Sequence, residues 1–326
     1  MKLARPWLLP LVPLYRFGQA VSAMRSAPTL KLSWPVISIG NLSTGGAGKT
    51  PLAITLAKAL TARGLHVDVL SRGYGRKTKI AQRVDPNGTA DQFGDEPLLI
   101  ARASGVPVYV ASDRFNAGLL AEADQADSSK PRVHLLDDGF QHRQLARHVD
   151  ILLLNRQDWT DTLLPAGNLR EPLKAARRAT VIAIPSDDAE LEADLRNWGW
   201  QGTIWRLHRR MEVPKIGGPV AAFCGIARPD QFFAGLDAAG LHIASRTIFA
   251  DHHRYDSHDL HCLLDAAQIV GATALITTEK DRARLGDLAA TFPDKISLLT
   301  AGLHIEIEDQ PGVVDWLIGQ CDIPIP

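Results

Sequence analysis

Short apolar runs alternate with amphipathic segments along most of the chain after residue 35. The runs lie at residues 36–39, 67–70, 106–110, 133–136, 151–154 and 181–184. Such unbroken apolar character is typical of strands buried on both faces of a parallel sheet. Between the runs, residues 52–60, 97–103, 114–123 and 189–198 have the character of helices. This alternation predicts an α/β fold with a mostly parallel sheet.

A second, smaller α/β pattern begins near residue 216. It predicts strands at 220–224, 241–249 and 274–277, with helices at 229–239 and 256–270. Residues 297–308 are expected to return to the first unit, and 312–318 to form a short helix. The predicted division is therefore an N-terminal segment at 1–28, a large domain at 29–202, a linker at 203–215, a second α/β domain at 216–296, and a return strand with a C-terminal helix at 297–326.

The first 28 residues combine basic and apolar side chains. They contain Lys2, Arg5, Arg16 and Arg25 but no acidic residue, and large apolar or aromatic side chains crowd residues 7–17. The apolar stretch is shorter than the ~20 residues of a membrane span, and three prolines interrupt it. Two interpretations stay open: an amphipathic helix at a lipid surface, or a helix that packs on its own domain.

Composition narrows the class of protein. The 326 residues are 45% hydrophobic and 22% charged, which is ordinary for a globular chain and argues against disorder. Thirty-six basic side chains balance thirty-six acidic ones, so the chain lacks the positive surplus of a nucleic-acid binder. The three cysteines are far apart and form no CxxC motif, as expected of reduced thiols in a cytosolic compartment.

The strongest local motif is a glycine-rich loop at residues 39–50, which joins the first predicted strand to the first predicted helix. In a P-loop of this kind, backbone N–H groups and the helix N-terminus bind phosphate oxygens. Lys49 would reach the β- and γ-phosphates of a nucleotide, and the Thr50 hydroxyl would ligate Mg²⁺. Ser43 stands where the usual motif has its first glycine. The residues predicted to bind nucleotide are Thr44, Gly45, Gly46, Ala47, Gly48, Lys49 and Thr50.

Charged side chains follow several predicted strands, at the sheet edge where ligands of α/β proteins bind. Asp137 and Asp138 stand where P-loop proteins hold Mg²⁺, although they could simply cap a turn. Asp95 precedes a helix and is either the base that a kinase needs or an N-cap. Arg114 is either a stabiliser of the transferring phosphate or one half of a surface ion pair.

Two further segments follow strands of the second unit. His252 and His253 begin a cluster that continues to Cys262, but the spacing matches no standard zinc pattern. A histidine that pairs with a catalytic carboxylate is the favoured interpretation. The segment Thr-Glu-Lys-Asp at residues 278–281 either contacts nucleotide or substrate, or is a solvated helix start.

These motifs, in this order, resemble the tetraacyldisaccharide 4′-kinase family of lipid A biosynthesis. Asp-Asp-Gly-Phe-Gln-His at residues 137–142 is the specific part of the resemblance, whereas the P-loop alone is not. Within this family the loop also lacks the standard first glycine, so Ser43 is no anomaly. The other matching segments are residues 40–51, 71–76, 94–97, 165–172, 225–229, 251–253 and 278–281.

The resemblance implies a P-loop kinase that uses ATP and Mg²⁺ to phosphorylate the 4′-hydroxyl of an acylated glucosamine disaccharide 1-phosphate, forming lipid IV-A. It implies that Asp95 is the catalytic base with His252 in support, and that Arg114 serves the transferring phosphoryl group. Lys49, Thr50, Asp137 and Asp138 would serve the phosphates and Mg²⁺. The residues implied on the substrate side are Asn168, Arg170 and Glu171.

The family acts at the cytoplasmic face of the bacterial inner membrane, so the N-terminal segment is expected to associate with that lipid surface. No obligate protein partner and no nucleic acid are implied. A membrane-associated ATPase or GTPase switch is the rival interpretation. Partner-completed P-loop proteins carry an extra lysine before the glycines, and here that position holds Thr44.

Overall fold

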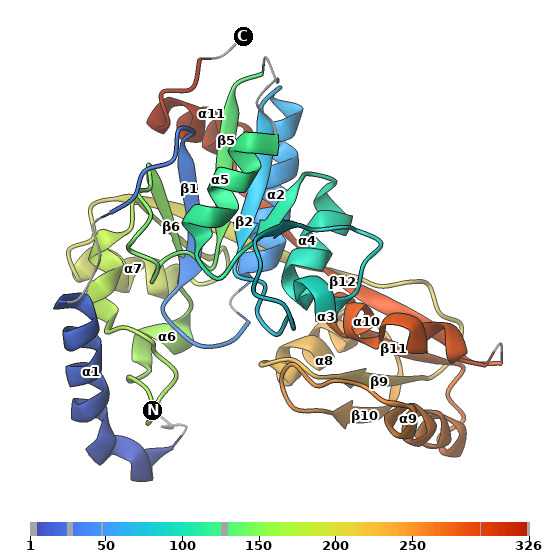
Figure 1. The fold of residues 1–326 in the computed structure, drawn as a ribbon. Coiled ribbons are helices and arrows are strands. Elements are labelled where there is room, and N and C mark those ends of the chain that lie inside the picture. Colours follow the sequence, from blue (N-terminus) through green and yellow to red (C-terminus); the bar gives the residue numbers. More distant parts are fainter. Residues whose placement is uncertain (1–4, 25–28, 47, 125–129, 294, 325–326) are drawn as a thin grey trace.

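The computed structural model describes residues 5–24, 29–46, 48–124, 130–293 and 295–324 (Figure 1). In this part of the chain, twelve strands form one sheet in the order β10-β9-β11-β12-β8-β7-β6-β1-β5-β2-β4-β3. The strands are β1 (Val36–Asn41), β2 (His66–Ser71), β3 (Gln82–Arg83), β4 (Val108–Val110), β5 (Arg132–Asp137), β6 (Val149–Leu153), β7 (Val181–Pro185), β8 (Thr203–Glu212), β9 (Val220–Cys224), β10 (Ile243–Ile248), β11 (Ala274–Thr278) and β12 (Ser297–Ile307).

Helices connect most of these strands. The α-helices are α1 (Val12–Met24), α2 (Lys49–Ala62), α3 (Ala90–Phe93), α4 (Asp95–Ser104), α5 (Arg114–Asp124), α6 (Arg156–Thr160), α7 (Ala189–Asn197), α8 (Pro229–Ala238), α9 (Ser257–Ile269), α10 (Glu279–Leu285) and α11 (Gln310–Gln320). The 3-10 helices are η1 (Pro6–Leu11), η2 (Leu173–Arg178) and η3 (Gly286–Thr291).

Strands β1 to β7 and helices α2 to α7 form what we call the large unit. All of its strands except the short β3 run parallel to their neighbours. Helices α2, α4 and α11 bury apolar side chains against one face of this sheet, and α5 and α7 cover the other. Because both faces are covered, the strands read as unbroken apolar runs. The predicted α/β fold with a mostly parallel sheet is confirmed.

Residues 203–212, which the sequence assigned to a linker, instead form the strand β8. This strand pairs parallel with β7 and antiparallel with β12. Trp205 and Leu207 are buried, whereas Arg206 and His208 are exposed, so the side chains alternate with the period of a strand. The linker prediction is therefore wrong for these residues. Charged side chains on the exposed face hid the alternation.

Strands β9 to β11 and helices α8 to α10 form what we call the small unit, drawn in orange at the lower right of Figure 1. Its strands run parallel, with α8 packed on one face and α9 on the other. Strand β12 pairs with β11 over residues 297–301 and with β8 over residues 302–307. One strand thus belongs to both units and returns the chain to the large unit, as predicted for residues 297–308.

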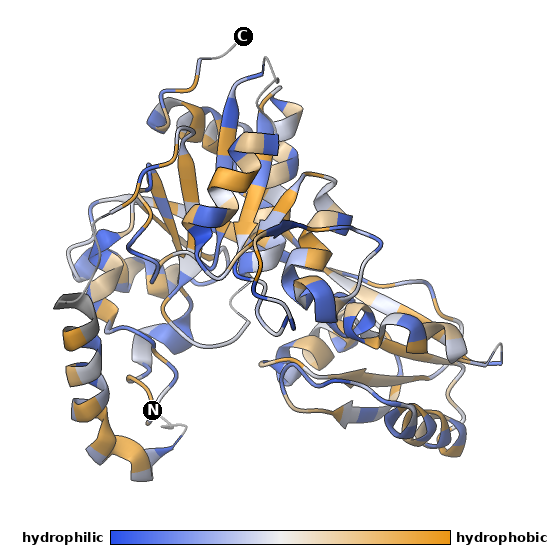
Figure 2. Ribbon diagram, in the orientation of Figure 1, coloured by the Kyte–Doolittle hydropathy of each residue, from blue (hydrophilic) through white to orange (hydrophobic). Residues whose placement is uncertain are grey.

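The N-terminal helices pack on the large unit by one face and expose apolar side chains on the other. Val12 and Tyr15 contact the core beside α7. Trp7, Leu14 and Phe17 are 72%, 68% and 67% exposed. In Figure 2, much of η1 and α1, at the edge of the molecule, has the orange colour of hydrophobic residues. Among the described residues, no helix is both long enough and apolar enough to cross a membrane.

Candidate active site

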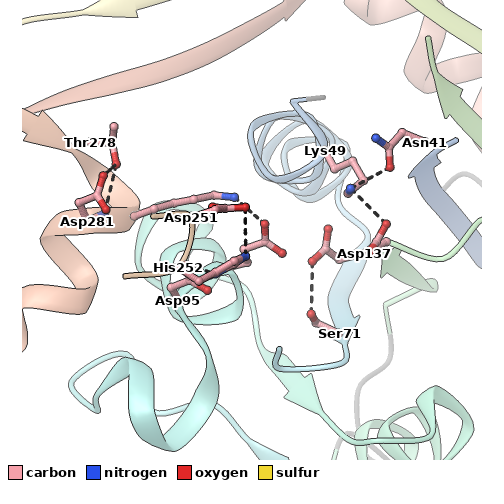
Figure 3. A network of polar contacts seen from close by, with 12 residues as sticks. Asn41, Lys49, Ser71, Asp95, Asp137, Asp251, His252, Thr278 and Asp281 are labelled. Carbon is pink, nitrogen blue, oxygen red and sulfur yellow. Dashed lines mark hydrogen bonds and ion pairs between the residues drawn. The ribbon is translucent and has the colours of Figure 1, made fainter. Parts of the chain in front are cut away.

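The phosphate loop joins the end of β1 to the start of α2. Gly45 and Gly48 have φ values of 105° and 93°, which L side chains rarely adopt. Lys49 is buried, and its Nζ donates a hydrogen bond to Asn41 Oδ1 at 2.9 Å (Figure 3). Thr50 is buried next to it. The loop thus places a cation at a helix N-terminus, which is an arrangement that binds phosphate groups. Ala47 lies outside the described residues.

Thr44 and Asn168 tie the phosphate loop to the segment that follows α6. The backbone N–H of Thr44 donates to the carbonyl of Asn168 at 2.8 Å. The side-chain amide of Asn168 donates to Asp161 Oδ2 at 2.9 Å. Asn168, predicted on the substrate side, therefore has a supporting position: its carbonyl holds the loop, and its side chain is directed at Asp161.

Asp138 lies directly after β5 and faces two cations. Its Oδ1 is 3.1 Å from Lys49 Nζ, and its Oδ2 accepts a hydrogen bond from Arg170 Nη1 at 2.9 Å. Burial alone would raise the pKa of Asp138, but Lys49 and Arg170 lower it to about 2. The backbone of Asp138 has a φ of 51°, an uncommon conformation for a residue other than glycine. This turn therefore holds an ionised carboxylate against the phosphate-loop lysine.

Asp137 has a different environment from that of its neighbour. Its Oδ2 accepts a hydrogen bond from Ser71 Oγ at 3.2 Å (Figure 3). Its Oδ1 is buried and has no hydrogen-bond partner among the described residues. Burial and the negative charges of Glu96 and Asp138 raise the pKa of Asp137 to about 7. A buried carboxylate oxygen without a partner fits a divalent cation, for which carboxylates are preferred ligands.

The ends of β1 and β5 interlock through one glycine. A Cβ on Gly40 would lie 2.5 Å from Cβ of Phe140, in the segment that follows Asp137 and Asp138. No side chain larger than hydrogen fits there without moving the backbone. This close approach fixes the position of the phosphate loop relative to the two carboxylates.

Arg114 begins α5 at the same edge of the sheet. It is buried, and its Nε has no hydrogen-bond partner among the described residues. Burial and the charge of Arg114 lower the pKa of the nearby His142 to about 4, so this histidine is neutral at pH 7. Arg114 thus presents an incompletely paired cation beside Asp138.

Arg170 and Glu171 follow the segment that holds the phosphate loop. Arg170 pairs with Asp138, as described above, and Glu171 accepts hydrogen bonds from Arg143 and Arg178, each at 2.8 Å. The backbone carbonyl of Arg170 also accepts a hydrogen bond from Tyr15 of α1 at 3.1 Å. The segment therefore connects the N-terminal helix to the site.

Asp95 and His252 come from different units and meet at the interface between them. Asp95 is the first residue of α4, and its Oδ2 is 3.3 Å from Nδ1 of His252, in the loop after β10. The Asp95 side chain is 5% exposed, whereas that of His252 is 35% exposed. His252 therefore forms part of the surface here, and Asp95 lies behind it. Like Asp138, His252 has a positive φ, of 59°.

A cavity of about 1500 Å³ brings most of these residues together. Lys49, Thr50, Asp137 and Asp138 line its phosphate-binding end, and His252 lines it from the small unit. Arg114 and Arg170 also contribute to its walls. Because both units line the same cavity, groups bound at the phosphate loop would face His252.

The other side chains of the histidine cluster are directed to separate partners. His253 Nε2 lies 2.7 Å from Asp259 Oδ2, and His258 Nε2 lies 3.7 Å from Cys262 Sγ. In the part of the chain that the structure describes, no three His, Cys, Asp or Glu side chains gather as a metal site. Asp256, in the same segment, is the N-cap of α9, and its side chain accepts a hydrogen bond from the Asp259 N–H. This residue therefore has a structural role.

Sequence reasoning missed Arg284, which lies on α10 and contacts Asp95. It also left Lys280 without a partner, and this side chain pairs with Glu96 Oε1. The available signal was the spacing of Asp281 and Arg284, because residues three apart on a helix are neighbours. Their contact with α4 is a tertiary feature that the spacing did not reveal.

The chain is similar to named proteins over nearly its whole length. Residues 4–322 match the family described as Tetraacyldisaccharide-1-P 4'-kinase. The Tetraacyldisaccharide 4'-kinase of Koribacter versatilis is 39% identical over 323 residues, which cover 95% of this chain and 97% of that protein. The protein of the same name from Rhodopseudomonas palustris (strain HaA2) is 36% identical over 326 residues, covering 97% of this chain and 92% of that protein.

A solved structure shares the fold. The crystal structure of "apo" form LpxK from Aquifex aeolicus in complex with ATP has a TM-score of 0.72 and 30% identity, and the match covers 96% of this chain and 98% of that chain. The family match at residues 4–322 and the structural match over 96% of the chain both extend over the two units. The chain belongs to the tetraacyldisaccharide-1-P 4'-kinase family.

Proposed function

We propose that this chain transfers the γ-phosphate of ATP to the 4′-hydroxyl of a tetraacyldisaccharide 1-phosphate, forming lipid IV-A in lipid A biosynthesis. Family membership supports the reaction class and the substrate. One observation carries the proposal for this chain: a single cavity is lined by a phosphate loop and by a histidine that contacts a buried carboxylate.

The residues suit an in-line phosphoryl transfer. The 4′-oxygen attacks the γ-phosphorus, the bond to the β–γ bridging oxygen breaks, and ADP leaves. The hydroxyl proton passes to the pair formed by Asp95 and His252. Phosphoryl transfer relies mainly on positioning and on charge stabilisation. Lys49 and Arg114 supply cations at the phosphate end, where charge develops.

Mg²⁺ fits the carboxylates at the end of β5, and we assign it to Asp137 and the Thr50 hydroxyl. Asp137 has a buried oxygen without a partner among the described residues, whereas Asp138 already pairs with Lys49 and Arg170. Mg²⁺ usually binds through one or two carboxylates together with substrate phosphates and water. When bound, it would neutralise charge on the phosphate oxygens.

We also propose that the N-terminal helices rest on the cytoplasmic face of the inner membrane, where the acylated substrate is embedded and ATP is available. Trp7, Leu14 and Phe17 are exposed apolar side chains, and Arg5 and Arg16 lie among them. Rings at a bilayer interface and basic groups near anionic lipid both favour such binding. The hydrogen bond from Tyr15 to Arg170 supports the proposal, because it brings this surface close to the site.

A labelled-phosphate assay tests the function. The full chain is incubated with γ-labelled ATP, Mg²⁺ and the lipid disaccharide 1-phosphate in detergent, with Lys49→Ala as the inactive control. Label in the lipid is expected from the unsubstituted protein alone. Label released only as inorganic phosphate, independent of the lipid, would overturn the kinase proposal and favour a membrane-associated ATPase or GTPase switch.

A further inference from the structure

We propose that Arg284 is a positioning residue for the acceptor side of the site: the small unit delivers it to Asp95 of the large unit, where it holds the carboxylate in place behind His252. This inference rests on the proposed kinase function. It gives a role to the helix that begins at residues 278–281, which the phosphate-binding motifs leave unused.

The guanidinium of Arg284 contacts one oxygen of Asp95 with two of its nitrogens. Nε donates to Asp95 Oδ2 at 2.8 Å, and Nη2 donates to the same oxygen. Nδ1 of His252 lies 3.3 Å from this oxygen as well. The Arg284 and Asp95 side chains are only 6% and 5% exposed. Contacts from Arg284 and His252 therefore converge on Oδ2 and restrict rotation of the carboxylate.

Arg284 is itself held by the small unit. Its Nη1 donates to Asp281 Oδ1 at 2.9 Å and to the carbonyl of Gly225 at 2.5 Å. Asp281 is fully buried and also accepts a hydrogen bond from the Tyr255 hydroxyl at 3.0 Å. Thr278 Oγ1 donates a further hydrogen bond to Asp281 at 2.7 Å (Figure 3). The guanidinium is therefore oriented before it meets Asp95. Such preorganisation is what a positioning group requires.

A second ion pair follows the same path between the units. Lys280 on α10 pairs with Glu96 on α4 at 2.5 Å, next to the pair of Arg284 and Asp95. Two cations of the small unit thus meet two consecutive acids of the large unit. Because α4 and α10 belong to different units, the environment of Asp95 is complete only where the units touch.

The charges around Asp95 favour its ionised form. Burial alone would raise the pKa of Asp95, but the hydrogen bond from His252 and the charges of Arg284 and Lys280 hold it well below its usual range. Asp251 lies 4.0 Å from His252 Nε2, and the ring of Tyr74 packs against the His252 ring. Glu96 is the neighbouring acid on α4. Without Arg284, fewer cations would offset burial and the negative charge of Glu96, so the pKa of Asp95 would rise.

The first test separates kcat, KM and pH dependence. Arg284→Ala is expected to lower kcat by about 10²-fold, since small displacements of catalytic groups have effects of this size. Its KM for ATP should stay within about twofold, and the acid limb of the kcat–pH profile should move upward by about one unit or more. Arg284→Lys keeps the charge but not the planar fork, so it should lose kcat by about tenfold with little movement of the limb. Arg282→Ala, at an exposed neighbour, should behave like the unsubstituted chain.

The second test asks whether Arg284 acts through Asp95. In the Asp95→Asn background, Arg284→Ala should change kcat by less than about twofold. The reason is that substitutions of residues that act through one another have effects that do not add. A loss of kcat in the double variant that equals the product of the two single losses would overturn the inference. An unchanged kcat in Arg284→Lys would overturn it as well. If Arg284→Ala does not fold, Arg284→Lys can be compared in the unsubstituted chain and in the Asp95→Asn background instead. Failure of the unsubstituted chain to label the lipid would instead refute the proposed function, so the two failures are distinguishable.

Discussion

The hydroxyl of Tyr15 donates a hydrogen bond to the backbone carbonyl of Arg170 at 3.1 Å, and the guanidinium of Arg170 in turn contacts Asp138. A single residue, Arg170, therefore connects the N-terminal helix to a carboxylate of the phosphate site. The exposed apolar surface of this helix, which we propose binds lipid, is therefore joined to the phosphate site by direct contacts, so loss of the helix should affect lipid binding and phosphate transfer together.

Replacing Trp7, Leu14 and Phe17 together with serine should reduce binding to anionic vesicles at least about tenfold. Full burial of one such side chain contributes about 1.5–3 kcal/mol, and an interface supplies part of that. The thermal midpoint should hardly change, because these side chains are exposed. Val12→Ser is the matched control: it should lower the midpoint, since Val12 packs on the core. Vesicle sedimentation that matches the unsubstituted chain would place lipid binding elsewhere.

Lys49→Ala should lower lipid phosphorylation by at least about 10²-fold, because removal of one charge-stabilising donor has effects of this size. Lys58→Ala, an exposed position on the same helix, serves as the control and should keep full activity. Both proteins should fold, as judged by thermal unfolding. Normal labelling of lipid by Lys49→Ala would remove the basis for the phosphate-loop assignment.

Asp137→Asn should raise the Mg²⁺ concentration needed for half-maximal phosphorylation more than Asp138→Asn does. The reason is that Asp137 has an oxygen without a partner among the described residues, whereas Asp138 is already paired with Lys49 and Arg170. A Mg²⁺ titration at saturating ATP measures the difference. Equal shifts in the two variants, or a larger one in Asp138→Asn, would contradict the assignment of Mg²⁺ to Asp137.

Asp95→Asn should lower kcat by ~10²–10⁴-fold, the usual contribution of a general base, while KM for ATP changes little. The substitution keeps the size of the side chain. Asp95 is the first residue of α4 and Gly94 holds the cap position, so the N-cap alternative is wrong and loss of a cap cannot account for this result. His252→Ala should add little in the Asp95→Asn background, because the two side chains are in contact. Steady-state kinetics of the single and double variants provide the check. A loss of kcat in the double variant equal to the product of the single losses would show that Asp95 and His252 act independently.

His134, which lies on β5 but does not line the cavity, should make the stability of the protein depend on pH. Its Nδ1 lies 2.6 Å from Asp68, and Nε2 lies 3.5 Å from Glu122. Burial alone would lower the pKa of His134, but these two carboxylates raise it to about 9. The stabilisation is therefore complete below about pH 6.5, the usual pKa of histidine, and is lost as the pH rises through about 9.

Denaturant unfolding between pH 6.5 and 9 measures this effect. The free energy of unfolding should fall by at most about 1.4 kcal/mol per pH unit in the unsubstituted chain. His134→Gln should flatten that slope, whereas His261→Gln, at an exposed position, should keep it. An identical slope in His134→Gln would show that other groups control the pH dependence.

Several features of this protein were predictable because their causes are local. The apolar runs that became β1, β2, β5 and β7 needed only burial on both faces to be recognised as strands. The phosphate loop is contiguous in sequence, so the positions of Gly48, Lys49 and Thr50 at the start of α2 follow from the chain itself. Asp137 and Asp138 could be placed at the same edge because parallel strands end together.

Only the tertiary structure decided which side chains meet across distant segments. Asp137 and Asp138 are neighbours in sequence, but their partners come from three separate segments of the chain: Ser71 for Asp137, and Lys49 and Arg170 for Asp138. The contact of Arg284 with Asp95 spans 189 residues and two units. The strand β8 became recognisable only through pairing with β7 and β12, because its exposed face carries charged side chains. Sequence periodicity reports the burial of each element, whereas contacts between elements depend on how those elements pack.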